Sequence, residues 1–413
     1  DAQKVADDLI ADQGFSSAPA EQQLALYVLS GKSLYNQQKL VECRARFEAA
    51  QKVSPSDVDV QRRLIDVINA QAYELLVRDS AAAPALLGQA AAIDPNSPVT
   101  LTNQAVLQLA NGECDAALST LGRLGNAQSA DAMLVNRLSA RAYLCQKTPN
   151  RAKADEHFAI AEREAKRVAN PEALAEIYAE WAPLTFDNDL DGTIVKLQTA
   201  INAKTAVPEV AQVAKRNMVI ALFKRGWRSL KDGKASEAAA DFERASKEPA
   251  LLVGNEPQAF EFSRALAQLE KGDTAGAGKV FKSLTAKGGA TAYLKAPYSK
   301  VGAQFFAAYA SYRGGTLASR TQAAAEFAKL SGEATGAFAN KLQELIASSW
   351  EYVSFEQFRS GNTGQASKAL TNGLKTADGQ IKRRLTHNRE VLGMNQGSLS
   401  YFVGVNGDPA EAW

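Results

Sequence analysis

The sequence has few of the residues that form turns, cofactor sites and reactive centres. It contains 13 prolines, 3 cysteines and 2 histidines in 413 residues. No apolar run approaches the roughly 20 residues that a transmembrane helix needs. Basic and acidic residues nearly balance at 47 and 45, so charge gives no reason to expect nucleic acid as a partner. The sequence also has neither a G-x-S-x-G elbow nor an H-E-x-x-H motif, so it predicts no enzyme and no cofactor. The lack of a long apolar run predicts no membrane-spanning segment.

A repeated apolar pattern fills most of the chain. Its apolar residues recur at steps of three and four, which indicates helices. A small residue, a bulky apolar residue four positions later and a small or apolar residue three positions after that recur nine times, at intervals of 34 to 46 residues. The nine triads begin at Cys43, Ala83, Ala117, Ala154, Thr193, Ala238, Ala277, Ala323 and Ala366. Each interval fits one helical hairpin.

A second feature lies twelve residues before each triad. Seven of the nine units have a small residue there, and Gln71 and Trp181 are the exceptions. Two antiparallel helices approach closely only where one offers a small side chain to the bulky side chain of the other, so this offset predicts paired helices. Glycines five residues before four of the triads are expected to end the first helix with a positive φ: Gly112, Gly233, Gly272 and Gly361.

The stretch "LYVLSGKSLYNQQKLVECRARFEAAQKVSP", which ends at Pro55, resembles the tetratricopeptide repeat (TPR). "RGWRSLKDGKASEAAADFERA" and "LAQLEKGDTAGAGKVF" repeat most of the pattern, and the resemblance covers roughly residues 20 to 375. It implies an all-α, superhelical α-solenoid of about nine TPR-like antiparallel helix pairs. It also implies a scaffold that holds a peptide or partner helix along a concave face.

The ends of the chain differ from its middle. We expect an N-terminal capping helix in residues 1–17, the TPR-like array in 18–375, and a charged helix followed by the start of a further repeat in 376–413. Gly407 and Ala412 repeat the spacing of a turn glycine and a first triad residue, with Trp413 directly after them. This spacing predicts that the chain is a fragment of a longer array.

"FDNDLDGTIVKLQ" resembles half of a calcium loop, because Asp187, Asp189 and Asp191 alternate before a glycine. Gln198 stands where a calcium loop has its bidentate glutamate, and the repeat register places these aspartates at the start of a second helix. Helix capping is therefore the favoured interpretation, with calcium binding as the alternative.

The cysteines indicate a possible bridge between neighbouring repeats. Cys43 occupies a core position, whereas Cys114 starts one second helix and Cys145 lies near the end of the next first helix. Those ends are adjacent in a stack of antiparallel helices, so a disulfide is one possibility and two separate thiols are the other. A bridge would favour an oxidising compartment such as the bacterial periplasm or cell envelope. Without one, a cytoplasmic protein remains the alternative.

The helical wheel predicts which side chains line the groove. Residues about 40 to 160 degrees around each first helix from its small residue should point into it. They form an aromatic stripe edged with cations, which suits an acidic peptide anchored on Trp227. Ordinary packing between repeats is the alternative. The predicted groove residues are Lys32, Tyr35, Asn36, Tyr143, Lys147, Phe223, Lys224, Trp227, Lys231, Tyr352, Phe355 and Arg359.

The sequence thus predicts a non-catalytic scaffold or adaptor for a protein or peptide partner, within a larger, envelope-associated assembly. A ligand- or carbohydrate-sensing module of a larger envelope enzyme or transport machine is the alternative function. A glycan or peptide array would separate these two possibilities.

Overall fold

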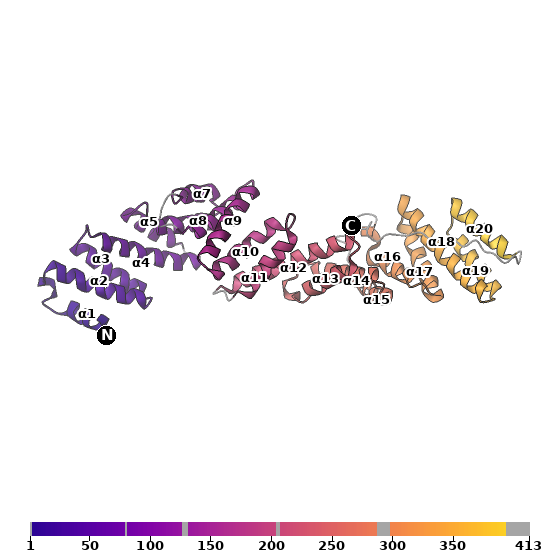
Figure 1. Cartoon of the computed structure of the whole chain (residues 1–413), viewed down its shortest axis with the longest axis horizontal. Coiled ribbons are helices and arrows are strands. Elements are labelled where there is room, and N and C mark those ends of the chain that lie inside the picture. The colour runs from indigo at the N-terminus through magenta and orange to yellow at the C-terminus, as the bar shows by residue number, and fades with distance from the viewer. Residues whose placement is uncertain (1, 79–80, 126–130, 204–206, 287–297, 394–413) are drawn as a thin grey trace. The chain divides into compact units, whose positions relative to one another are not determined.

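The computed structural model describes residues 2–78, 81–125, 131–203, 207–286 and 298–393 (Figure 1). Every regular element in these ranges is a helix, so the all-α prediction is confirmed. The chain divides into two compact units. The first comprises residues 1–184 and 203–206, and the second comprises residues 185–202 and 207–413.

The first unit holds the helices up to α10, whose last residue belongs to the second unit. They are α1 (Ala2–Ala11), the 3-10 helix η1 (Phe15–Ser17), α2 (Ala20–Asn36), α3 (Leu40–Val53), α4 (Val58–Val77), α5 (Ala83–Ile93), α6 (Pro98–Ala110), α7 (Cys114–Gly122), α8 (Ala132–Cys145), α9 (Arg151–Arg167) and α10 (Pro171–Thr185).

The second unit holds the remaining helices. They are α11 (Leu190–Asn202), α12 (Pro208–Lys231), α13 (Ala235–Ala245), η2 (Pro249–Leu251), α14 (Glu256–Glu270), α15 (Thr274–Ala286), α16 (Tyr298–Arg313), α17 (Leu317–Leu330), η3 (Ser331–Glu333), α18 (Gly336–Arg359), α19 (Thr363–Leu374) and α20 (Gly379–Gly393).

Successive helices pack as the repeat pattern predicts. In the first unit α2 packs on α3, α4 on α5, α6 on α7 and α8 on α9. In the second unit the pairs are α12 with α13, α14 with α15, α16 with α17 and α18 with α19. The division between the units falls inside the fifth predicted pair, so α10 and α11 are described separately. The predicted start of a further repeat, near Gly407 and Ala412, lies outside the described residues.

The nine triads form the core of the second helices. Every member of every triad is buried. A residue four positions after a small one lies on the same face of a helix, so each triad forms a narrow buried stripe along its helix. The register read from the sequence is therefore the register of the structure.

Close approach of the paired helices depends on the small residue opposite the bulky one. A Cβ atom on Gly226 would lie 2.6 Å from Cε1 of Phe242, and one on Gly31 would lie 2.9 Å from Cζ of Phe47. Both distances are shorter than van der Waals contact, so the ring occupies the space that a side chain would need. This is the packing that the twelve-residue offset predicts.

We expect Gly226→Ala to lower the free energy of unfolding by about 1–3 kcal/mol, because the added methyl group must displace the ring of Phe242. Gly88→Ala in α5 is the matched control, since no atom lies within 4 Å of the corresponding Cβ position. There, loss of glycine's backbone freedom should stabilise the helix by up to about 1 kcal/mol. Urea unfolding followed by circular dichroism measures both changes. Equal effects of the two substitutions would contradict the packing account.

The turns between paired helices also follow the predicted pattern. Gly112, Gly233, Gly272 and Gly361 all have positive φ, between 73° and 96°. Gln38 occupies the same position in the first pair with φ 62°, although a residue with a Cβ atom rarely adopts this conformation. Tight turns therefore close these five pairs, whichever residue stands at the turn.

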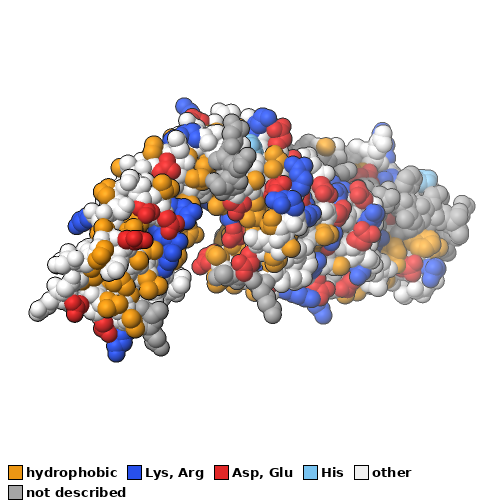
Figure 2. All heavy atoms as spheres, turned by 60° about the vertical axis from the view of Figure 1, so that its left-hand side comes forward, with side chains coloured by type: hydrophobic (Ala, Val, Ile, Leu, Met, Phe, Trp, Pro, Cys, Tyr) orange, Lys and Arg blue, Asp and Glu red, His pale blue; other side chains and the backbone are white. Residues whose placement is uncertain are grey.

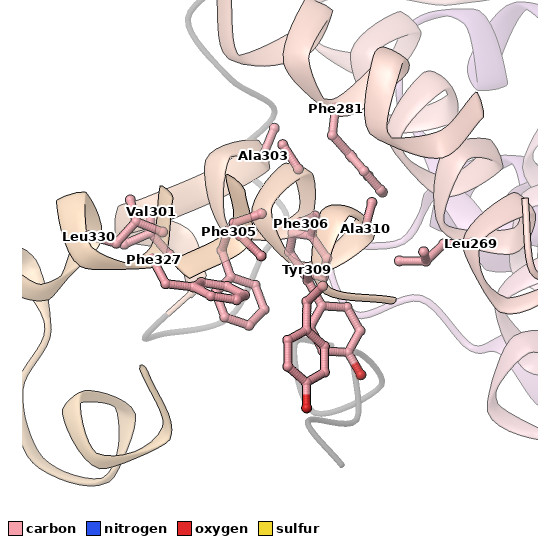
Figure 3. Packing of buried hydrophobic residues seen from close by; sticks show 14 of the residues in the cluster. Leu269, Phe281, Val301, Ala303, Phe305, Phe306, Tyr309, Ala310, Phe327 and Leu330 are labelled. Carbon is pink, nitrogen blue, oxygen red and sulfur yellow. The ribbon is translucent and has the colours of Figure 1, made fainter. Parts of the chain in front are cut away.

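An extended aromatic cluster lies in the second unit. The ring of Phe306, on α16, contacts Phe262 and Phe281, with centroids 4.9 and 5.6 Å away. The ring centroid of Phe305, the preceding residue on α16, lies 5.7 Å from that of Phe327, and Figure 3 shows their rings side by side. Because these rings come from α14, α15, α16 and α17, one continuous core joins two neighbouring helix pairs.

The helix α20 packs on the last pair through apolar side chains and one buried ion network. Leu385 is fully buried against α18 and α19. Nearby, Nε of Arg384 lies 2.9 Å from Glu351 Oε1, and Nη2 lies 3.0 Å from Glu344 Oε2. The amide of Asn388 also donates to Glu351, at 3.2 Å. This network fixes α20 against α18.

Candidate functional site

Three of the predicted groove residues line a hollow in the first unit. Lys32, Tyr35 and Asn36 lie on α2, where a spacing of three and four residues places them on one side of the helix. The hollow has a volume of about 410 Å³, and its lining is completed by Phe47 of α3 and by Arg63 and Asp66 of α4. It is therefore built by the first helix pair and the first helix of the next pair.

The polar side chains of this hollow are largely unengaged. Among the described residues, those of Lys32, Tyr35, Asn36 and Asp66 form no hydrogen bond and no ion pair. All four are exposed. Arg63 differs, because its Nε donates to Asp59 at 2.9 Å. One ammonium, one phenol, one carboxamide and one carboxylate thus line a single cavity without a side-chain partner in the described part of the chain.

Asp66 lies in an electrostatically unusual place in this hollow. Its side chain keeps contact with solvent. Partial burial of the carboxyl removes water from it and raises its pKa, while the positive charges of Arg62 and Arg63 oppose this rise. A cation brought to Asp66 would stabilise its charged form.

The predicted residues on α12 are mostly engaged within the chain. The ring of Phe223 lies 4.4 Å from that of Phe260, and the ring of Trp227 lies 5.9 Å from that of Phe242. Lys224 donates to Asp187 at 2.7 Å, whereas Lys231 is exposed. Phe223 and Trp227 are half-buried in this ring cluster. Their surroundings favour the packing role that the sequence left as the alternative.

The remaining predicted residues lie on α8 and α18 or directly after them. Tyr143 stacks on His157 with centroids 5.4 Å apart, and Lys147 is exposed. Tyr352 donates its hydroxyl to the carbonyl of Gly315 at 2.5 Å. Phe355 is half-buried, and Arg359 lies 3.8 Å from Glu356 on its own helix. The twelve residues are spread over both units, and three of them meet in the hollow of the first pair.

The three aspartates of the calcium-like stretch each have a bonding partner. Asp189 Oδ1 accepts the backbone N–H of Gly192 at 3.0 Å, which caps the start of α11. Asp187 pairs with Lys224, and Asp191 accepts from Arg225 and Arg228 at 3.0 and 2.8 Å. Hydrogen bonding to Arg225 is the main cause that lowers the pKa of Asp191. Across the described ranges, no three His, Cys, Asp or Glu side chains gather as metal ligands would.

These ion pairs border a second hollow that the sequence did not predict. It has a volume of about 380 Å³ between α11, α12 and α13. Arg225, on its wall, bonds the buried carboxylate of Asp241 at 2.7 Å. Most of its facing charges are paired with one another, and among the described residues Asp232 is the exception. The hollow is lined by Asp191, Arg225, Arg228, Ser229, Asp232, Lys234, Glu237, Ala240 and Asp241.

The cysteines divide into one bridge and one thiol. Cys114 at the start of α7 and Cys145 at the end of α8 form a disulfide, with Cα atoms 5.8 Å apart. The bridge joins two successive helix pairs. Cys43 is a buried free thiol whose Sγ lies 3.2 Å from the carbonyl oxygen of Gly31. No described helix is both long and apolar enough to span a bilayer.

Comparison with known proteins gives structural likeness alone. The sequence matches no family model and no curated protein. Its fold is similar to a signal transduction ATPase with a tetratricopeptide repeat sensor from Pyrococcus horikoshii, with 14% identity and a TM-score of 0.35 over 93% of this chain. This chain spans only 56% of that protein.

Two further solved structures are similar. A tetratricopeptide repeat protein from Parabacteroides merdae has 14% identity and a TM-score of 0.28, covering 79% of this chain and 98% of the other. Yeast Tom70 has 13% identity and a TM-score of 0.21, covering 91% and 96%. Scores this low say nothing about partners, and the helix pairs themselves define the fold. The chain is an all-α solenoid. Its repeating unit is TPR-like, because a small residue on the first helix meets a bulky residue of the triad on the second helix. Gly31 with Phe47 and Gly226 with Phe242 have the same offset in sequence.

Two lining residues of the first hollow, Arg63 and Asp66, were not predicted. The helical wheel selects residues on one side of each first helix, such as Tyr35 on α2. The opposite wall of the hollow is formed by the other side of the next first helix, α4. A second wheel, drawn for the facing side of α4, would have found them.

Proposed function

We propose that the chain is a non-catalytic scaffold that binds an extended segment of a protein partner in the hollow of the first helix pair. The observation that carries this proposal is the set of four unengaged polar side chains around one cavity. An extended segment presents backbone N–H and C=O groups that need partners. Asn36 can serve both kinds of group, and Tyr35 adds a rigid, amphipathic contact surface.

The mixed surface supports recognition at a local site. On the face shown in Figure 2, acidic and basic side chains are interspersed over the described residues. A partner held only by a broad field of one charge would need a large patch of the opposite sign. The hollow instead offers individual groups, which favours a defined segment with defined side chains.

The disulfide supports a place for this scaffold in an oxidising compartment, such as a periplasm or cell envelope. The division into a cap (1–17), an array (18–375) and a C-terminal segment (376–413) stays a prediction, and so does membership of a larger complex.

A random peptide library and a glycan array, both probed with the whole chain, test the function. Retention of peptides and not of sugars is the expected result, and retention of sugars alone would overturn it.

We expect Tyr35→Ala to weaken binding of library-selected peptides by about 2 kcal/mol, because exposed tyrosines at binding sites are frequent affinity anchors. Tyr35 is 38% exposed, so its removal should leave the helical content unchanged. Tyr73→Ala is the matched control, since Tyr73 lies on α4 outside the hollow and is 54% exposed. Isothermal titration gives the affinities. If both variants bind as the parent does, the hollow is not the site.

A further inference from the structure

Asp66 is an unpaired carboxylate although two arginines precede it closely on the same helix. Arg62 Nη2 lies 2.5 Å from Asp59 Oδ1, and Arg63 Nε lies 2.9 Å from Asp59 Oδ2. Both guanidinium groups therefore point back along α4 to Asp59, and neither forms an ion pair with Asp66. The negative charge of Asp66 stays available in the hollow.

Lys32 supplies the opposite charge from the other wall. It lies on α2, and Asp66 lies on α4, while Phe47 of α3 contributes to the lining. The two groups form no ion pair. The hollow thus has a cation, Lys32, on its α2 wall, and on its α4 wall the carboxylate of Asp66 beside Arg63, which is already paired with Asp59.

We propose that this hollow selects a polypeptide segment that carries both a basic and an acidic side chain, the basic one placed on Asp66 and the acidic one on Lys32. This rests on the function proposed above and replaces the purely acidic peptide expected from the sequence. A purely acidic segment would bring one of its charges against Asp66. A purely basic segment would bring one against Lys32. Each mismatch costs affinity, so the pair of walls also fixes the direction in which the segment lies.

The test uses the whole chain and peptides selected by it from a random library. We expect the selected peptides to share a basic and an acidic position. Replacing the basic residue of one such peptide by Gln should weaken its binding to the parent chain about tenfold, as for one charge-assisted hydrogen bond. The same replacement should have little effect on binding to Asp66→Asn, which keeps the shape of the side chain and removes its charge. Lys32→Gln should behave in the same way toward the acidic position.

Glu74→Gln is the control, because Glu74 is an exposed carboxylate on α4 outside the hollow. On this variant the basic-to-Gln peptide should still bind about tenfold more weakly than its parent. Unchanged melting temperature and circular dichroism show that each variant folds. Selected peptides with no basic position, or an equal loss on Asp66→Asn and on the parent chain, would overturn the inference and leave the scaffold function standing. If no peptide is retained at all, the proposed function itself fails.

Discussion

Replacing Arg384 by Ala is expected to lower the free energy of unfolding by about 3–5 kcal/mol, because it leaves the carboxylate of Glu351 buried without its cation. Glu351 is only 2% exposed, and burial raises the pKa of its carboxyl while Arg384 opposes the rise. Without Arg384 the ionised form becomes still less favourable in the folded state. Urea unfolding at neutral pH measures the loss.

The pH dependence of this variant has a defined sign. A carboxyl whose pKa is raised in the folded state holds its proton more tightly there, so it favours folding at low pH and loses that contribution as pH rises through the folded value. Glu351 starts from an ordinary pKa of 4.5, and burial moves the folded value upward. The Arg384→Ala variant should therefore lose less stability at pH 4 to 5 than at pH 7.

Two further variants complete the test of the buried network. Arg383→Ala removes the exposed neighbouring arginine and should change stability by less than about 0.5 kcal/mol. Arg384→Met with Glu351→Gln removes both charges and should recover most of the loss. A similar small effect of Arg383→Ala and Arg384→Ala would contradict the structural role of the network.

Loss of the Cys114–Cys145 disulfide is expected to destabilise the first unit by about 3–4 kcal/mol, because the bond closes a loop of about 31 residues in the unfolded chain. The bond also holds α7, a helix of only nine residues, against the end of α8. Gln146 and Asp115, each next to one of the cysteines, add a hydrogen bond of 2.6 Å. Melting temperatures with and without reductant measure the contribution.

The double variant Cys114→Ser with Cys145→Ser provides the control for reduction. It should melt near the temperature of the reduced parent and should not respond to reductant. The response to reductant of the parent then belongs to this bond and not to Cys43. Identical melting of the oxidised and reduced parent, with reduction verified by mass, would show that the bridge contributes no stability.

The fold could be predicted from sequence because it follows from local packing rules. The offset of a small residue from a bulky one determines which helices pair, and Gly226 against Phe242 shows the contact directly. Local exceptions could not be predicted. Gln38 adopts a positive φ at a turn where four other pairs have glycine, and Gly302 interrupts α16 with φ 50° and ψ −141°. Both depend on the surrounding tertiary structure.

The candidate site was only half predictable, because side chains on equivalent sides of the first helices have different neighbours. Tyr35 and Trp227 both lie in the predicted sector. Beside Trp227, Phe223 packs against Phe260 of the next first helix, so the space there is filled by rings. Beside Tyr35, the next first helix presents Asp66 and Arg63, and a hollow remains. Identical helical register thus leads to a packed cluster in one repeat and an open cavity in another.

The buried thiol of Cys43 makes the opening of the first helix pair measurable. In the oxidised protein it is the one free thiol, since the other two cysteines are joined. It is fully buried, and desolvation raises its pKa to about 11. Because only the thiolate reacts, a thiol-directed reagent modifies Cys43 when α2 and α3 separate transiently. The labelling rate therefore reports the local opening free energy of the pair that carries Lys32 and Tyr35, without any introduced probe.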